Sequence, residues 1–213
     1  MIRFLLDPLY PPRCVLCHKF LPNSREPVCP DCARRVLSQY PSFRQGRYFS
    51  LCVAPLRYEE PVRGSIHRYK FGNRSFYADV YGPWLAAAVM RDLAGRFDLV
   101  AWVPVSRKRR RERGYDQAQL LAEQVADLLQ MPVCHCLKKV RDNPPQSGVE
   151  TPEERRKNVR GRYMPLDPEQ FENKRILLVD DVITTGETME ECSRVLCTAG
   201  AEQVVCAALA MTK

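Results

Sequence analysis

The chain has 213 residues, which suits either one α/β domain with a small appendage or two compact domains. Hydrophobic residues make up 45% of it and charged residues 27%, as in an ordinary soluble globular protein. No apolar run approaches the roughly 18 residues that a membrane helix needs, and the apolar stretch at the start is too short for a secretory signal. These properties argue against an integral membrane segment and favour a cytoplasmic protein with reduced cysteines.

The formal net charge is +8 and the pI is about 9.0. Such an excess of positive charge favours anionic partners, which include phosphates, nucleotides, nucleic acid and an acidic membrane surface. It serves solubility equally well, so the charge alone does not choose among these partners.

In chain order, residues 1–50 come first, and they are rich in Cys, Pro and Arg without sustained periodicity. This is typical of a small stapled module or a loop-rich lead-in. A short run of apolar and β-favouring residues then predicts a strand at 50–58, and helical patterns follow at 61–69 and 78–93. We therefore divide the chain into a small N-terminal module, residues 1–48, and a main domain, residues 49–213.

The rest of the main domain alternates strands with helices. A nearly continuous apolar strand at 99–105 is followed by a basic turn at 106–113 and an amphipathic helix at 117–129, and a short strand is expected at 133–137. The last predicted elements are a buried strand at 175–179, a helix at 188–198 and a strand at 203–210. This alternation predicts an α/β fold with a doubly wound parallel sheet.

Four cysteines form two C-x-x-C pairs, Cys14 with Cys17 and Cys29 with Cys32. Two such pairs at this spacing complete a tetrahedral shell of four thiolates, which zinc favours. Four thiolates leave no open coordination position, so we expect a structural zinc site that supplies folding energy to a module too small to bury a core. A redox pair or chance spacing is the alternative, and the other six cysteines fit core positions.

The strongest functional signal follows the strand at 175–179. Two carboxylates, Asp180 and Asp181, precede a Thr/Gly turn that opens a helix. Free backbone N–H groups, hydroxyls and the positive end of the helix dipole converge at such a turn, so a phosphate monoester fits there, and Gly186 lets the backbone approach it closely. The two carboxylates are better placed to accept hydrogen bonds from sugar hydroxyls. A chance strand–turn–helix is the structural alternative.

A second candidate site is the basic run at 107–113, just past the strand at 99–105, because ligands of open α/β sheets bind beyond the carboxyl ends of strands. Three interpretations stay open for this run: a pyrophosphate site, with Ser106 and Arg107 as the contacts; a nucleic-acid patch built on Arg109, Arg110 and Arg111; and a solvated basic turn.

Residues 179–188 resemble the 5-phosphoribosyl-1-pyrophosphate (PRPP) motif of type I phosphoribosyltransferases. The resemblance extends along almost the whole chain, through the cysteine pairs, Tyr69-Lys70-Phe71-Gly72, Val103-Pro104-Val105, Arg113-Gly114-Tyr115-Asp116-Gln117, Gln146-Ser147-Gly148 and Arg155-Arg156-Lys157-Asn158-Val159. In that order these motifs resemble the ComF/GntX family, which joins a zinc finger to a phosphoribosyltransferase domain and is associated with DNA uptake or with the use of external DNA. Tyr115-Asp116 stands where Phe-Asn is more usual.

The resemblance implies a type I phosphoribosyltransferase-like fold that binds PRPP with magnesium, which would bind mostly through the ligand and waters. Asp180 and Asp181 would hold the ribose hydroxyls and favour positive charge at the anomeric carbon. The 5-phosphate would be held by five consecutive residues, which are Thr184, Thr185, Gly186, Glu187 and Thr188.

Residues 142–162 would then form the loop that closes over the site, with Gln146, Arg155 and Asn158 as candidate contacts; a solvated linker helix is the alternative. Lys70 could reach a phosphate or could lie along the surface with its charge in water.

Three functions remain open on these residues. The first is a magnesium-dependent phosphoribosyltransferase with an unknown acceptor. The second is a single-stranded DNA-binding protein, and the third is an interaction factor for a DNA-uptake helicase or channel, with a phosphoribosyltransferase domain that acts as a sensor or a silent scaffold. For all three functions we expect a cytoplasmic location. Peripheral attachment at the inner face of the membrane would suit a channel partner.

Overall fold

The computed structural model of the chain describes residues 11–21, 26–37, 41–141 and 160–212. Among them, six strands form one main sheet in the order β1-β2-β8-β7-β4, with β3 beside β8. These strands are β1 (Ser42–Arg44), β2 (Cys52–Ala54), β3 (Leu56–Arg57), β4 (Leu99–Trp102), β7 (Arg175–Ile183) and β8 (Gln203–Met211). β1 runs antiparallel to β2, and the other pairs are parallel. The predicted parallel sheet is therefore confirmed, with one antiparallel strand at its edge.

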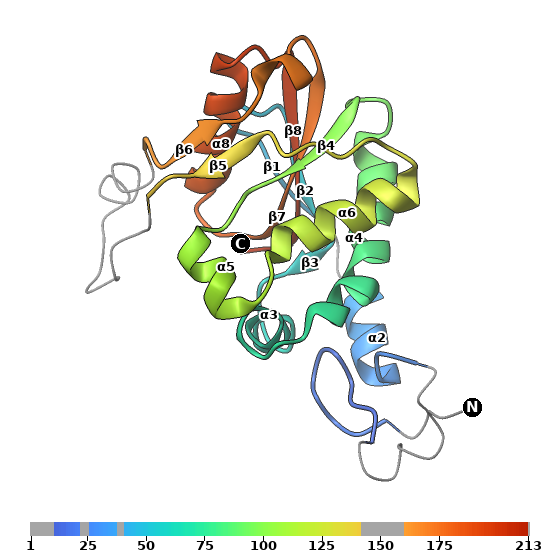
Figure 1. Cartoon of the computed structure of the whole chain (residues 1–213). Coiled ribbons are helices and arrows are strands. Elements are labelled where there is room, and N and C mark those ends of the chain that lie inside the picture. The colour runs from blue at the N-terminus through green and yellow to red at the C-terminus, as the bar shows by residue number, and fades with distance from the viewer. Residues whose placement is uncertain (1–10, 22–25, 38–40, 142–159, 213) are drawn as a thin grey trace.

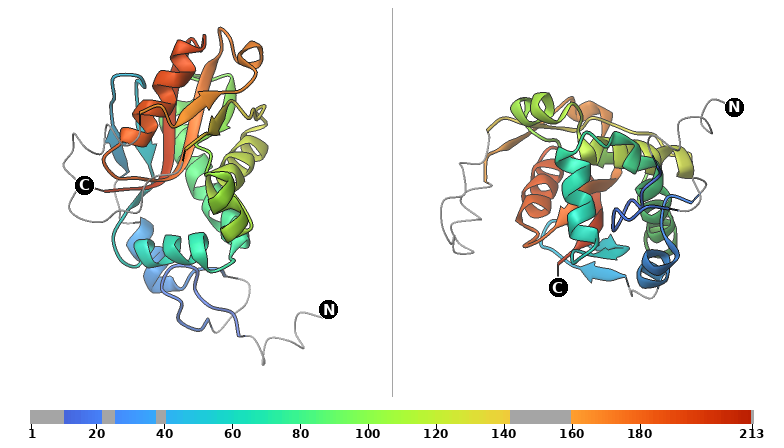
Figure 2. Two further views of the ribbon diagram at one scale, coloured as in Figure 1. Left: turned by 60° about the vertical axis from the view of Figure 1, so that its left-hand side comes forward. Right: turned by 90° about the horizontal axis from the view of Figure 1, so that it is seen from below.

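Helices cover both faces of this sheet (Figures 1 and 2). The α-helices are α2 (Pro30–Leu37), α3 (Val62–Phe71), α4 (Ala78–Leu93), α5 (Arg107–Arg113), α6 (Gln117–Leu129) and α8 (Glu187–Thr198), and the 3-10 turns are η1 (Ser75–Tyr77) and η2 (Pro168–Gln170). α4 and α6 pack against one face, whereas α8 and the hairpin of β5 (Leu137–Lys139) and β6 (Tyr163–Pro165) pack against the other. This is the doubly wound arrangement that the alternation of elements predicts.

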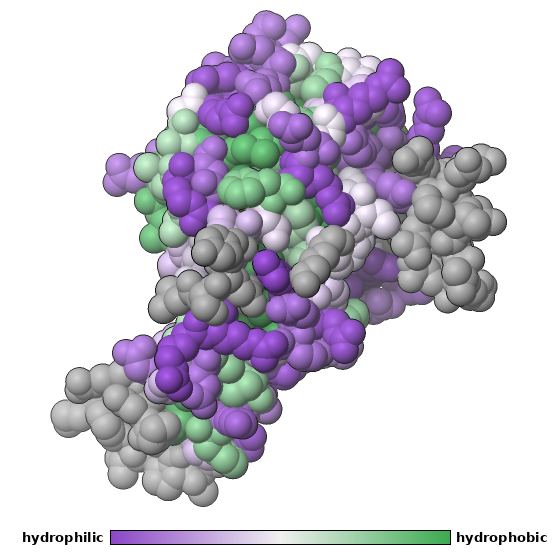
Figure 3. Space-filling model, turned by 180° about the vertical axis from the view of Figure 1, so that it is seen from behind, coloured by the Kyte–Doolittle hydropathy of each residue, from purple (hydrophilic) through white to green (hydrophobic). Residues whose placement is uncertain are grey.

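The core strands are apolar along their length because both of their faces are covered. Ile176, Leu177, Leu178 and Val179 of β7 are fully buried, and successive side chains join opposite core layers. None of the described helices is long and apolar enough to cross a bilayer. On the rear face of the molecule most of the surface is hydrophilic, and hydrophobic residues gather mainly in a limited area of the upper body (Figure 3).

The N-terminal module lies at one end of the molecule, next to α3 (Figure 1). Its residues Cys14, Val15 and Leu16 are buried in the same core layer as Tyr69 and Leu85 of the main domain. β1 lies before the predicted boundary at residue 48 and already pairs with β2. The boundary itself stays a prediction.

Several predicted elements differ from the structure in their bounds. The strand at 50–58 is divided into β2 and β3 around Pro55, which has no N–H to donate to a ladder. The expected short strand at 133–137 is reduced to a single bridge between Val133 and Val100, and β5 begins only at Leu137. α8 begins at Glu187, one residue before its predicted start.

The basic stretch at 106–113 was expected to be a turn and is helical. Ser106 accepts a hydrogen bond from the backbone N–H of Arg109 and so caps the start of α5. Gly114 ends the helix with a φ of 81°, a left-handed conformation that glycine adopts without strain. The sequence held both signals, a serine cap and a terminal glycine, around a run of good helix formers.

Candidate functional site

β7 is longer than predicted, and its extension carries the two acidic residues. Its pairing with β8 continues past Val179 as far as Ile183, opposite Met211. On its other edge, the last contact with the β4 side is the hydrogen bond from the Val103 N–H to the Val179 carbonyl, 2.9 Å long. Pro104 follows and has no N–H, so the ladder stops there. The segment that begins at Asp180 is therefore paired on one edge only, at the carboxyl end of the sheet where ligands of open α/β folds bind.

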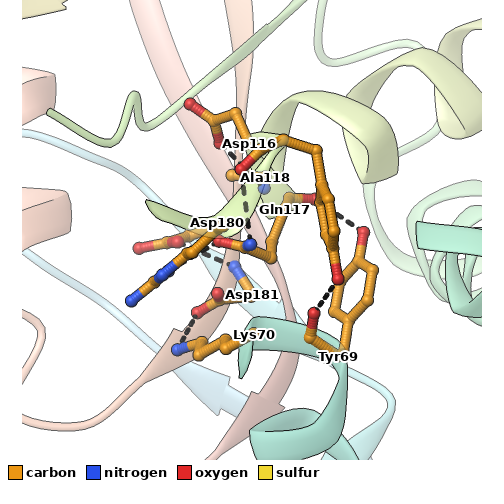
Figure 4. A network of polar contacts seen from close by, with 9 residues as sticks. Tyr69, Lys70, Asp116, Gln117, Ala118, Asp180 and Asp181 are labelled. Atoms are coloured by element: carbon orange, nitrogen blue, oxygen red, sulfur yellow. Dashed lines mark hydrogen bonds and ion pairs between the residues drawn. The ribbon is translucent and has the colours of Figure 1, made fainter. Parts of the chain in front are cut away.

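Asp180 and Asp181 alternate along the strand, and the two carboxylates have different surroundings. Asp181 is 7% exposed, and one of its oxygens lies 2.8 Å from Nζ of Lys70 on α3 (Figure 4). Asp180 accepts a hydrogen bond from the Asp181 N–H over 2.7 Å. Burial raises the pKa of Asp180, the neighbouring charge of Asp181 raises it further, and Lys70 opposes both. Two carboxylates held this closely are poised to receive positive charge.

A hydrogen-bonded network holds Lys70 in position. Tyr69 is fully buried, its hydroxyl donates to the Gln117 carbonyl over 3.0 Å, and its own carbonyl accepts from the Tyr115 hydroxyl (Figure 4). Asp116, which is 4% exposed, caps α6 and also accepts the N–H of Val105 over 2.9 Å. Burial raises the pKa of Asp116, and the backbone N–H groups that it accepts oppose that shift. α3, α6 and the chain after β4 are thus fastened around the carboxylates.

The predicted phosphate turn follows directly. Thr184 and Thr185 are exposed, and Gly186 lies at the start of α8 with a φ of 88°. The left-handed φ favours glycine, and a Cβ on this residue would lie 3.2 Å from Nη1 of Arg44. Glu187 and Thr188 form the first turn of α8 and are half-buried. The turn therefore has the open hydroxyls and the helix start that the sequence indicates.

Arg44 of β1 is a component of this turn that the sequence reasoning missed. Its Nη1 donates to the Thr184 carbonyl over 2.5 Å, although the two residues are 140 positions apart. The same hairpin is held to α8 by Glu190, whose carboxylate accepts the N–H groups of Arg47 (2.8 Å) and Tyr48 (3.2 Å). No sequence signal could have identified Arg44, since its placement depends on the tertiary pairing of β1 with β2.

The other predicted site residues are more scattered. Ser106 is buried and uses its hydroxyl as the cap of α5, and Arg107 is exposed at the start of that helix. Arg109 is half-buried, whereas Arg110 and Arg111 are exposed on the same helix. The three predicted loop contacts, Gln146, Arg155 and Asn158, lie outside the described residues.

The four cysteine sulfurs lie together. Sγ atoms of Cys14, Cys17, Cys29 and Cys32 are all within 4.8 Å of one another, and those of Cys17 and Cys29 are 3.7 Å apart. Four sulfurs at about 2.3 Å from a tetrahedral zinc ion would be about 3.8 Å from one another, so a cluster of this size suits zinc. Elsewhere in the described chain, no further group of three or more metal-binding side chains converges in this way.

The first cysteine knuckle is fastened to α3. Arg68 donates from Nη2 to the carbonyls of Val15 (3.1 Å) and Leu16 (2.6 Å), and the hydroxyl of Ser65 also donates to the Val15 carbonyl. Arg68 and Lys70 lie on the same helix, so the zinc module and the carboxylate pair share one support.

Comparison with known protein families gives one match for the N-terminal module and one for the main domain. A model of the phosphoribosyl transferase domain matches residues 116–213, and a model of the double zinc ribbon domain matches residues 5–48. Together with the geometry of the four sulfurs, the second match identifies a structural zinc site. The first match and the sheet order identify the phosphoribosyltransferase fold.

Several curated proteins are similar along most of the chain. Competence protein F of Haemophilus influenzae is 29% identical over 216 residues, which cover 90% of this chain and 93% of that protein. Competence protein ComFC of Bacillus subtilis is 26% identical, over 86% of this chain and 70% of that protein. DNA utilization protein YhgH of Salmonella typhimurium is 27% identical, over 91% of this chain and 94% of that protein.

Some solved structures are similar to part of this chain. A glutamine phosphoribosylpyrophosphate amidotransferase from B. subtilis, complexed with ADP and GMP, has a TM-score of 0.44 and 24% identity over 63% of this chain. The match spans only 26% of the amidotransferase chain. An adenine phosphoribosyltransferase from Thermoanaerobacter pseudethanolicus has a TM-score of 0.40 and 16% identity, over 67% of this chain and 84% of that one.

Replacing one zinc ligand tests the metal site. Cys14→Ser should remove the bound zinc, which metal analysis of the purified protein measures, and should lower the melting temperature because metal binding supplies folding energy to the module. Cys134→Ser is the matched control, since Cys134 is half-buried and lies outside the sulfur cluster. Full zinc occupancy in Cys14→Ser, or none in the unaltered protein, would contradict the assignment.

The raised pKa of Asp180 predicts a pH-dependent gain in stability on its neutralisation. The carboxyl pKa is raised to about 8 in the folded chain, whereas in the unfolded chain it lies near about 4, so stability is lost progressively as the pH rises from the lower to the higher value. Asp180→Asn removes that cost and should stabilise the protein by roughly 1–2 kcal/mol at neutral pH, or about 2–8 °C in Tm, with little gain near about pH 4. Thermal unfolding across this pH range measures the effect.

Asp127→Asn is the control for that experiment because Asp127 is exposed on α6. It should shift the free energy of unfolding by less than about 0.5 kcal/mol at every pH. A gain for Asp180→Asn that stayed constant with pH would show that the carboxyl pKa is not raised.

Proposed function

Because the chain belongs to the ComF/GntX family, we propose that it is a PRPP-binding protein of the phosphoribosyltransferase fold that acts in the uptake or use of external DNA. The observation that carries this proposal is the placement of Asp180 and Asp181 at the carboxyl end of β7, directly before the turn at Thr184 and Gly186. A sugar phosphate needs hydroxyl acceptors at one position and an anion cradle a few residues further along, and β7 with its turn supplies both in sequence.

The binding arrangement follows from the residues present. The 5-phosphate lies at the turn from Thr184 to Thr188, where backbone N–H groups and hydroxyls donate hydrogen bonds to its oxygens and Arg44 adds a cation. The ribose hydroxyls donate to the carboxylates of Asp180 and Asp181. The pyrophosphate group then lies toward Ser106 and Arg107, where the positive charges of α5 stabilise it.

The same groups suit phosphoribosyl transfer. As the bond between the anomeric carbon and pyrophosphate breaks, positive charge develops on the sugar and negative charge on the leaving group. Asp180 and Asp181 stabilise the first charge, and Arg107 with its neighbours on α5 stabilises the second. The acceptor is a nucleophile that this arrangement does not specify, so transfer is the activity to be tested after binding.

Magnesium fits the proposed ligand as well as the protein. Carboxylate and phosphate oxygens are the donors that this ion prefers, and it would neutralise part of the pyrophosphate charge when bound. Asp181 is already paired with Lys70 at 2.8 Å, whereas the described residues offer Asp180 no ion pair. Asp180 is therefore the carboxylate that would accept a water from the hydrated ion.

Titration of PRPP with magnesium into the zinc-loaded protein tests the proposal. The unaltered protein should bind, and Asp180→Asn with Asp181→Asn should abolish binding in a protein that still unfolds in one cooperative thermal transition. Pyrophosphate release in the presence of nucleobases or of single-stranded DNA then tests transfer and its acceptor class. Unchanged affinity in the double variant would refute the site, and no binding by the folded, zinc-loaded protein would refute the proposed ligand.

Arg44 gives a further prediction for the same ligand. Arg44→Ala should weaken PRPP binding about tenfold, since a charge-assisted hydrogen bond to a phosphate contributes roughly 1.5–3 kcal/mol in favourable cases. Arg44→Lys should recover part of the affinity. Arg47→Ala is the control, because Arg47 is exposed on the same hairpin and contacts α8 only through its backbone N–H. Equal affinities for the two alanine variants would remove Arg44 from the phosphate site.

The nucleic-acid alternative retains one specific observation in its favour. α5 carries Arg110 and Arg111 exposed on the surface, and no residue of this helix is buried. Exposed arginines on a short helix can contact a phosphate backbone without disturbing the carboxylate site. Single-stranded DNA binding is therefore compatible with PRPP binding rather than opposed to it.

A further inference from the structure

A cavity of about 480 Å³ lies at the end of β4 and is lined by residues of α5 and β5. Figure 1 shows where these two elements lie. Its volume falls in the range of small-ligand sites in proteins, about 300–1,000 Å³. It shares Arg107 with the predicted pyrophosphate position, but Asp180, Asp181 and the phosphate turn are not among its lining residues. The proposed PRPP site therefore does not account for it.

Two aromatic rings line this cavity and stack on each other. The centroids of Trp102 and His135 are 4.7 Å apart, and the ring planes differ by 14°. Trp102 is 7% exposed whereas His135 is exposed, so the histidine supplies the more accessible ring. A planar aromatic ligand could extend this stack, because stacking tolerates any ring with an open π-face.

The polar lining is strongly basic. Arg107 and Arg110 lie three positions apart on α5, and Lys138 and Lys139 come from β5. The lining also contains one carboxylate, Asp116, which already accepts the backbone N–H groups of Val105, Ala118 and Gln119. The cavity therefore combines a stacking surface with an excess of positive charge, and these are the two features that recognise a base and a phosphate.

From this combination we infer that the cavity between α5 and β5 is a second ligand site that binds a free nucleoside 5′-phosphate, with the base stacked on the His135–Trp102 pair and the phosphate held by Arg107, Arg110 and Lys138. The inference does not rest on the proposed PRPP-binding function, although the two sites share Arg107. Lys139 also lines the cavity, and its Nζ lies 5.3 Å from the centroid of the Tyr163 ring on the paired strand β6.

Tryptophan fluorescence provides a local measurement. The chain has two tryptophans, Trp84 and Trp102, so Trp84→Phe leaves Trp102 as the only reporter. Addition of dAMP to this zinc-loaded variant should quench Trp102 in a saturable manner. His135→Ala should weaken the apparent affinity at least about tenfold, as expected for a lost stacking contact. Arg110→Ala should weaken it about threefold or more, whereas Arg111→Ala, on the same helix but outside the cavity lining, should not.

Three further measurements distinguish a second nucleotide site from the PRPP site, from a basic surface and from a single-stranded DNA site. Quenching that persists in the double variant Asp180→Asn with Asp181→Asn supports a second site, and its loss there would overturn the inference by assigning the nucleotide to the PRPP site. The inference would also be overturned if inorganic pyrophosphate bound as tightly as dAMP and His135→Ala had no effect. The cavity would then bind anions through its positive charge alone. Quenching by single-stranded DNA but not by dAMP would overturn the assignment to a free nucleotide.

Discussion

The ion pair between Lys70 and Asp181 is the contact on which the candidate site depends. Two adjacent carboxylates at the end of a buried strand repel each other and lose hydration, and a cation at 2.8 Å offsets part of both effects. Lys70 can do so only because Tyr69 anchors the same turn of α3 to α6 through the Gln117 carbonyl. The carboxylates, the helix and the chain after β4 are therefore positioned by a single connected set of contacts.

α3 also connects the zinc module to the candidate site at the end of β7. Two residues before Lys70, Arg68 donates two hydrogen bonds to the carbonyls of the first cysteine knuckle. Zinc fixes the knuckle, the knuckle fixes one side of α3, and α3 presents its cation to Asp181. The metal is thus remote from any chemistry at β7 but contributes to the geometry there through one helix.

Local patterns predicted well what depends on local physics. The helices at 78–93 and 117–129 have the predicted bounds because their apolar spacing continues to their ends, and the four cysteines converge as their spacing indicates. The acidic pair lies within β7 and not after it, because the pairing with β8 continues to Ile183. The partners of that pair were not predictable, because the placement of Lys70 against Asp181 and of Arg44 against Thr184 depends on contacts 111 and 140 positions apart in the chain. Sequence periodicity carries no information on such contacts.

Because of the hairpin that carries Arg44, the N-terminal module and the main domain are not expected to fold well as separate fragments. A fragment that began at residue 49 would lack β1, so the outer edge of β2 would be exposed and free to pair with another chain. Glu190 would also lose the two N–H groups of Arg47 and Tyr48 that its carboxylate accepts. Transfer of residues 1–48 to another domain would therefore leave behind an aggregation-prone sheet edge.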